Sequence, residues 1–274
     1  MNSLERSLVT KAGYDHGWEV VIDETAPAFL VLGSANHRAQ TTVRAAGGGG
    51  WIVQFPAGRL TSELSRVVGL RRDGGGGVAA ANERELGALL AHASRLARTL
   101  PDLPCRRYER AVSDELARVA EGPTATEVER IVRQRVGQDI YRESLLDYWG
   151  GACAVTGIEL PELLRASHAK RWADCASDAE RLDVFNGFLL AAHLDALFDR
   201  YLLTFDLAGL AVLSPRVDAT TRGRLGLTHD LRLRWLSPEH ETYLAVHREE
   251  FTRQTSVETG FSLCPSSPRL NTLA

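Results

Sequence analysis

The first part of the chain alternates short apolar runs with turn residues. Residues 3–12 can form a short helix, and four runs rich in β-branched or apolar residues follow it: WEVVIDE (18–24), FLVLGS (29–34), TTVRAA (41–46) and WIVQFP (51–56). Runs of this length separated by turn residues are typical of β-strands. The pattern predicts a small antiparallel sheet.

Two polyglycine segments interrupt this region. AGGGG stands just before Trp51, and DGGGG stands just before Val78. Such segments are too flexible to carry regular structure, so we expect a hairpin loop at the first and a separator between the sheet and a helix at the second. From Asn82 to about Arg98, leucines and alanines recur at helical spacing behind an asparagine cap, which predicts a long helix.

The pattern changes again in the second half. Two prolines in TLPDLPC break the chain before helical periodicity resumes in residues 106–122 and 126–151, so we expect a domain boundary between about 101 and 128. After Gly151, strand-like runs are followed by a closing amphipathic helix. The expected strands cover residues 152–157, 163–169, 187–192, 202–206, 210–214 and 231–237, with a short helix at 193–200 and the closing helix at 237–254.

These patterns predict an α+β protein with more than one domain. Residues 1–100 form the predicted N-terminal sheet domain, 101–132 a helical linker, 133–260 a C-terminal domain and 261–274 a loose tail. A length of 274 residues favours two domains, and 44% hydrophobic and 24% charged residues fit a soluble protein. No signal peptide and no run of about 20 apolar residues is found, so we expect a cytoplasmic protein without a membrane segment.

Charge and cysteine content narrow the function. The formal net charge of −3 argues against a nucleic-acid binder whose whole surface is basic, although it leaves room for a local basic groove. The four cysteines lie far apart in the sequence and predict neither a zinc ribbon nor a disulfide framework. A reducing compartment fits best.

One group of polar residues suggests a catalytic site. His168 lies in LLRASHAKRW, and Asn186, His193 and Asp195 lie in FNGFLLAAHLDALFDR. Two strands and a short helix could bring these side chains to one divalent cation and one water. Phosphodiester hydrolysis needs a base to deprotonate water and a cation to neutralise charge on the phosphate. Each residue alone is more often structural, but together in this order they favour catalysis.

CAVTGIELPELLRASHAKRWAD and FNGFLLAAHLDALFDRYLLTFD resemble the HNH endonuclease family, which has the ββα-metal fold. The resemblance covers roughly residues 133–253 and is nearest to the branch common in modification-dependent restriction endonucleases. It implies that His168 is the general base and that Asn186 orients the loop and the base. It also implies one divalent ion, Mg²⁺ or alternatively Mn²⁺ or another transition ion, held by residues at the start of the helix.

The sequence departs from the family pattern at the expected ligands. Many members have an aspartate directly before the base, where this chain has Ser167, and the usual final histidine is replaced by Asp195. We keep Ser167, His193 and Asp195 as candidate ligands, with Asp195 preferred. Because the site is altered, loss of activity stays an alternative. Without CxxC pairs, no structural zinc is expected.

Double-stranded DNA, modified or not, is the expected partner. Lys170 and Arg171 follow the predicted base and are the best candidates for phosphate contacts. In the N-terminal domain, His37 and Arg38 lie in SANHRAQ, a polar turn between strands that suits contact with DNA. Trp18 and Trp51 could line a pocket for a flipped base, although core positions in a small sheet are the more common role of such residues.

The sequence therefore predicts a restriction endonuclease with an N-terminal target-recognition domain. A homodimer would suit cleavage of both strands. Two alternatives stay open: a DNA-binding protein whose HNH domain is inactive, and a nonspecific or nicking nuclease.

Overall fold

The computed structural model describes residues 1–47, 49–66, 70–100, 103–118, 125–227 and 230–260. The N-terminal part is an antiparallel sheet with strand order β1-β2-β3-β4-β6-β5, as the sequence predicts for its first four strands. The strands are β1 (Val20–Asp23), β2 (Phe29–Gly33), β3 (Thr41–Ala45), β4 (Trp51–Gln54), β5 (Arg71–Arg72) and β6 (Val78–Ala80). The accompanying helices are α1 (Ser3–Asp15), α2 (Arg59–Leu64) and α3 (Glu83–Thr99).

We expected the second polyglycine segment to separate the sheet from a helix, and this prediction is wrong. The segment is the turn between β5 and β6, which extend the same sheet. The Asp73 carboxylate accepts the backbone N–H groups of Gly75 and Gly77, and the Asp73 N–H donates to the Gly77 carbonyl at 2.9 Å. An aspartate that binds its own downstream backbone fixes a turn that glycine alone would leave loose.

The two N-terminal tryptophans belong to the core. Trp18 is 1% exposed and donates its indole N–H to the Leu90 carbonyl at 2.8 Å, which joins the start of the sheet to α3. Trp51 is 7% exposed in β4. Neither ring is presented to a ligand, so the aromatic pocket considered above is not formed by these side chains.

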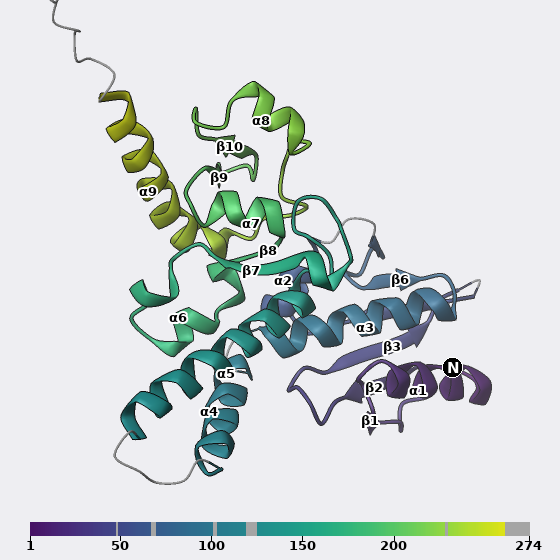
Figure 1. The fold of residues 1–274 in the computed structure, drawn as a ribbon. Helices are drawn as coiled ribbons and strands as arrows, with labels where there is room; N and C mark the ends of the chain where they lie inside the picture. The colour runs from purple at the N-terminus through teal and green to yellow at the C-terminus, as the bar shows by residue number, and fades with distance from the viewer. Residues whose placement is uncertain (48, 67–69, 101–102, 119–124, 228–229, 261–274) are drawn as a thin grey trace, which may run out of the picture.

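Helices α4 (Leu103–Leu116) and α5 (Ala125–Tyr148) connect the two halves. They pack against each other, and α5 also packs on α3 and on the C-terminal strands β7 and β8. Figure 1 shows α3 and α5 between the N-terminal sheet and the C-terminal elements. The buried Glu63 of α2 accepts hydrogen bonds from Tyr148 Oη at 2.7 Å and Ser237 Oγ at 3.0 Å, which fastens the halves together.

The C-terminal part consists of two small hairpins with helices around them. The strands are β7 (Leu164–His168), β8 (Gly187–Ala191), β9 (Leu203–Phe205) and β10 (Ala211–Leu213). The helices are α6 (Asp178–Leu182), α7 (Ala192–Phe198), α8 (Ala219–Arg224) and α9 (Glu241–Gly260), with short 3-10 turns at Pro161–Leu163, Trp172–Asp174, Val184–Asn186 and Pro238–His240. The tail predicted at 261–274 lies outside the described residues.

Two predicted strands in this part are wrong. Residues 152–157 form turns, because the buried Cys153 sulfur accepts the backbone N–H groups of Val155 and Thr156 and bends the chain back. Residues 231–237 make a single bridge, between Arg232 and Leu210. The alternation there reflects packing of an irregular segment, in which Arg234 donates to the Trp149 carbonyl. Within the described ranges, no helix combines the length and apolarity needed to cross a membrane.

Candidate active site

A short hairpin and one helix frame the candidate site. β7 and β8 pair antiparallel from Leu164 opposite Ala191 to His168 opposite Gly187, and α7 follows β8 directly. Gly187 is required here because a Cβ at this position would lie 2.0 Å from the Ser167 carbonyl oxygen. The β7 backbone at Ser167 therefore leaves no room for a side chain at position 187, at the end of the hairpin that carries His168.

The His168 ring is held on three sides. It stacks on Tyr141 with centroids 3.8 Å apart, and it meets the Trp172 ring edge-on at 5.6 Å. Its Nε2 lies 2.9 Å from the Arg181 carbonyl oxygen. Because a carbonyl only accepts, Nε2 must carry a proton. Burial lowers the pKa of His168 to about 4, so the ring is neutral near pH 7 and its lone pair is on Nδ1.

Asn186 is fully buried and fixes the loop that follows His168. Its Oδ1 accepts the Lys170 N–H at 2.8 Å, while its Nδ2 donates to the carbonyls of Lys170 at 3.2 Å and Glu180 at 2.9 Å. An amide can serve donors and acceptors at once, which no carboxylate or aliphatic side chain does. These contacts are those of a positioning residue, and its part in catalysis stays a prediction.

The predicted ligands do not converge as a set of three. Ser167 Oγ donates to Asp195 Oδ1 at 2.6 Å. His193 precedes Asp195 by two positions in α7, so the two side chains leave the helix about 160° apart, on nearly opposite faces. Successive residues of a strand also point to opposite faces, which separates Ser167 from His168. In the part of the chain that the structure describes, no three His, Cys, Asp or Glu side chains form a metal cluster.

A pocket of about 230 Å³ lies beside His168. Its lining comprises Ala166, His168, Arg171, Trp172, Phe198, Asp199, Tyr201 and His247. Asp199 follows Asp195 by one helical turn, and burial together with the Asp195 charge raises the pKa of Asp199 to about 6. The Arg171 guanidinium lies 5.0 Å above the Tyr201 ring. The pocket thus combines an imidazole, a carboxyl group of raised pKa and a guanidinium.

His247 has a structural place in this pocket. Its Nδ1 is 2.9 Å from Thr204 Oγ1, and its Nε2 is 3.0 Å from the Phe198 carbonyl. Its ring stacks on Phe198 at 3.8 Å. Both nitrogens of His247 are therefore engaged in hydrogen bonds within the protein.

Comparison with known families identifies this region. A family model described as HNH endonuclease matches residues 153–206, which include β7, β8, α7 and β9. Residues 153–206 belong to the HNH endonuclease family. The family predicted from the sequence is confirmed by this match, and the chain carries a nuclease domain of the HNH type. A search of curated proteins gives no match.

HNH nucleases generally use a divalent metal ion. Mg²⁺ is commonly held by one or two carboxylates, with water and substrate phosphate completing its shell. The HNH domain offers Asp195 and, one turn later, Asp199. The residues present therefore fit a site in which two carboxylates hold the ion and water and substrate phosphate supply its other ligands, and they do not form a site made of protein ligands alone. The roles predicted for Ser167 and His193 as ligands stay predictions.

The residues predicted to bind DNA have different surroundings. Lys170 pairs with Glu180 at 2.7 Å, so much of its charge is already neutralised, whereas Arg171 lines the pocket beside His168. His37 is 5% exposed and packs edge-on against Trp18 at 4.6 Å. Arg38 is exposed in the wall of a second cleft. Contact of these four residues with DNA stays a prediction.

Sequence reasoning missed three residues of the HNH site. The spacing of four between Asp195 and Asp199 is a signal that could have identified Asp199, because it places both on one helical face. Tyr141 and the Arg181 carbonyl gave no such signal. Both reach His168 through tertiary packing, which no local pattern reveals.

Proposed function

We propose that this protein is a metal-dependent DNA endonuclease that restricts foreign or modified DNA, with its N-terminal domain recognising the target. An HNH nuclease domain implies DNA as the substrate. The observation that carries the proposal is the arrangement of His168 within the HNH match: Nε2 is fixed on a backbone carbonyl, so Nδ1 is left as a proton acceptor.

Each residue has a defined task in the proposed hydrolysis. His168 Nδ1 takes the proton from the attacking water, and the stacked Tyr141 ring fixes the plane of the imidazole. Asn186 holds the loop that leads away from His168. Arg171 pairs with a phosphate oxygen at the pocket. Asp195 and Asp199 would hold the divalent ion, which when bound neutralises charge on the phosphate and the leaving oxygen.

Plasmid cleavage tests the activity. The purified protein is incubated with supercoiled plasmid in Mg²⁺, in Mn²⁺ or in EDTA, and products are resolved on a gel. We expect cleavage that EDTA abolishes and that His168→Ala lowers by roughly 100- to 10,000-fold. His16→Ala, a partly exposed histidine of the N-terminal domain, is the matched control. Cleavage that survives His168→Ala would exclude the assigned base.

The restriction role needs a second comparison. Plasmids that differ only in base methylation are cleaved in parallel, and a modification-dependent enzyme cleaves one of them preferentially. Equal rates favour a nonspecific nuclease, and nicked circles that never become linear favour a nicking enzyme. A gel shift with no cleavage in either metal favours a DNA-binding protein with an inactive HNH domain. Sedimentation of the DNA complex tests the homodimer.

A further inference from the structure

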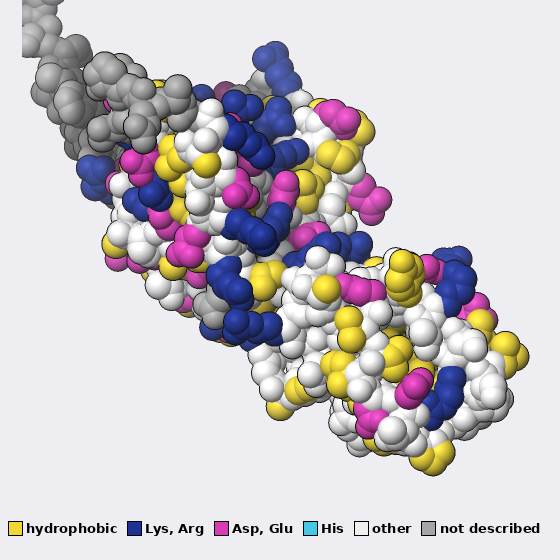
Figure 2. Space-filling view, turned by 90° about the horizontal axis from the view of Figure 1, so that it is seen from below, with side chains coloured by type: hydrophobic (Ala, Val, Ile, Leu, Met, Phe, Trp, Pro, Cys, Tyr) yellow, Lys and Arg dark blue, Asp and Glu magenta, His cyan; other side chains and the backbone are white. Residues whose placement is uncertain are grey.

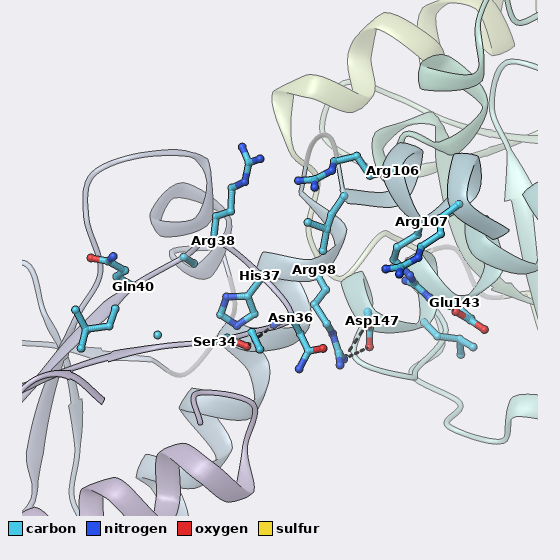
Figure 3. Close-up of a pocket in the computed structure, with 17 residues that line it drawn as sticks. Ser34, Asn36, His37, Arg38, Gln40, Arg98, Arg106, Arg107, Glu143 and Asp147 are labelled. Carbon is cyan, nitrogen blue, oxygen red and sulfur yellow. Dashed lines mark hydrogen bonds and ion pairs between the residues drawn. The ribbon is translucent and has the colours of Figure 1, made fainter. Parts of the chain in front are cut away.

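A second, larger cleft lies away from His168. It has a volume of about 1150 Å³ and runs between the loop after β2 and the helices α3, α4 and α5. Figure 3 shows Ser34, His37 and Arg38 on one wall and Arg106, Arg107 and Glu143 on the other. The cleft thus lies between the N-terminal sheet domain and the helices that lead to the HNH domain.

The cleft carries an excess of positive charge. Of the residues that the structure describes, five arginines and two carboxylates, Asp147 and Glu143, line it. Arg98 pairs with Asp147 at 3.0 Å, and Arg107 pairs with Glu143. The remaining three, Arg38, Arg106 and Arg110, are exposed and have no carboxylate partner among the described residues.

The unpaired guanidinium groups face the open space. In Figure 3, Arg106 extends from α4 toward the wall that carries Arg38, so the two side chains lie on opposite sides of the cleft. Like charges on opposite sides of a cleft favour an anion between them. Figure 2 shows a band of Lys and Arg side chains that reaches the place where the two lobes of the molecule meet.

The residues that line the cleft suit the phosphate backbone of DNA better than a base flipped out of the helix. Proteins that bind bases outside the helix stack them on aromatic or apolar side chains. Among the described residues, no Phe, Tyr or Trp lines this cleft, and the one ring in its lining is the largely buried His37. Gln40 also lines the cleft, whereas the Ser34 and Asn36 side chains donate to the Glu19 carboxylate. Arginine and other polar side chains commonly bind phosphate and sugar oxygens.

The cleft also lies close to the HNH domain in the structure. Helix α4 carries Arg106 and Arg110 into the cleft, and between them it carries Tyr108. The Tyr108 ring and the Trp172 ring both lie over Gly137 of α5, and Trp172 touches the His168 ring. One helix therefore separates the cleft from the residues around the proposed base.

We propose that the cleft between the β2–β3 loop and α4 binds the phosphodiester backbone of the DNA, with Arg38, Arg106 and Arg110 as the phosphate contacts. The proposal rests on the proposed nuclease function for the identity of the ligand. It assigns the N-terminal domain a share in holding the backbone, in place of an aromatic pocket for a base.

Equilibrium binding tests the proposal without cleavage. A fluorescein-labelled DNA duplex is titrated in EDTA, and its anisotropy is followed at several salt concentrations. The slope of log K against log salt is negative, and each lost phosphate contact makes it less steep by about 0.9. In the triple variant Arg38→Ala/Arg106→Ala/Arg110→Ala the magnitude of the slope should therefore decrease by about 2.7. We also expect at least about a tenfold increase in Kd at moderate salt.

A matched triple variant controls for total charge. Arg84→Ala/Arg118→Ala/Arg130→Ala removes three exposed arginines outside the cleft. It should change the salt slope and Kd far less. Equal effects of the two triple variants, or no effect of the cleft variant, would overturn the proposal. Because Arg38, Arg106 and Arg110 are exposed, far-UV circular dichroism should show both variants folded; if the cleft variant is not, the three single variants replace it.

The failure of this proposal can be distinguished from failure of the nuclease. If wild type binds DNA through the cleft arginines and cuts nothing, the binding site stands and the nuclease proposal fails. If wild type cuts DNA and the cleft variant binds and cuts with the same Kd and KM, the cleft proposal fails and the nuclease stands. If wild type does not bind DNA at all, the cleft proposal fails.

Discussion

Replacing Asn186 tests whether one amide organises the loop after His168. Asn186→Ala removes hydrogen bonds to the Lys170 N–H, the Lys170 carbonyl and the Glu180 carbonyl, at a position that is 0% exposed. Each such bond contributes about 1 kcal/mol net, and a buried group left without a partner costs about 1–3 kcal/mol. We expect the free energy of unfolding to fall by about 3 kcal/mol or more.

Asn186→Asp is the more specific test of the hydrogen bonds that Asn186 donates. The carboxylate keeps the shape of the amide and still accepts the Lys170 N–H, but it can donate to neither carbonyl and faces both as an acceptor. It should therefore destabilise the protein more than Asn186→Ala at neutral pH. Burial beside two carbonyls raises the pKa of this carboxyl, so as the pH is lowered from 7 toward 4 its protonation restores one donor and the difference between the two variants should narrow progressively.

Urea unfolding followed by far-UV circular dichroism measures the loss, and hydrogen exchange with mass spectrometry locates it. Exchange should speed up most in residues 169–182, where the loop is held. Asn2→Ala is the control, since this exposed N-cap bonds only at the start of α1 and should cost about 1 kcal/mol. A cost below about 1 kcal/mol for Asn186→Ala, or an aspartate variant as stable as wild type, would refute the reasoning.

Three further substitutions test the packing around the site. Burial lowers the pKa of His240 to about 4, so between pH 6.5 and 4 the unfolded chain binds more protons than the folded one, and the free energy of unfolding decreases as the pH is lowered. His240→Leu should remove up to about 1.4 kcal/mol per pH unit of this dependence, measured by urea unfolding from pH 7.5 to 5. Tyr148→Phe should cost about 1.5–3 kcal/mol, and a double-mutant cycle with Glu63→Gln should give a nonzero coupling energy, whereas additive effects would argue against the bond. Gly187→Ala should cost about 3 kcal/mol or more because of its 2.0 Å clash, while Gly223→Ala, whose Cβ meets nothing within 4 Å, should be neutral or slightly stabilising by thermal unfolding.

The sequence predicts elements well where local pattern and packing agree. The first four strands, the helix behind Asn82, the hairpin that carries His168 and the short helix after it lie where periodicity places them. The errors occur where side chains replace regular backbone pairing. The Cys153 sulfur accepts backbone N–H groups in a predicted strand, and the Asp73 carboxylate makes a turn from an apparently loose segment.

The candidate site is predictable only in part, for the same physical reason. Residue order along the chain identifies His168 and Asn186, because the hairpin brings them together locally. The residue order does not show in which direction each side chain points. His193 and Asp195 are close in sequence and diverge around α7, while Tyr141 is far in sequence and stacks on His168. Sequence spacing carries no information about such long-range contacts.

Helix α5 joins the three features on which the proposals depend. Tyr141 stacks on His168, Glu143 and Asp147 hold two arginines in the wall of the cleft, and Tyr148 binds the buried Glu63 of α2. A single helix of 24 residues keeps these groups at fixed separations. DNA held by the cleft would therefore meet the HNH site in a geometry set by α5, without closure of one half on the other. Reaction rates fall steeply when a substrate is misplaced by about 1 Å, so loosening the Glu63–Tyr148 contact should slow cleavage by the proposed nuclease as well as lower its stability.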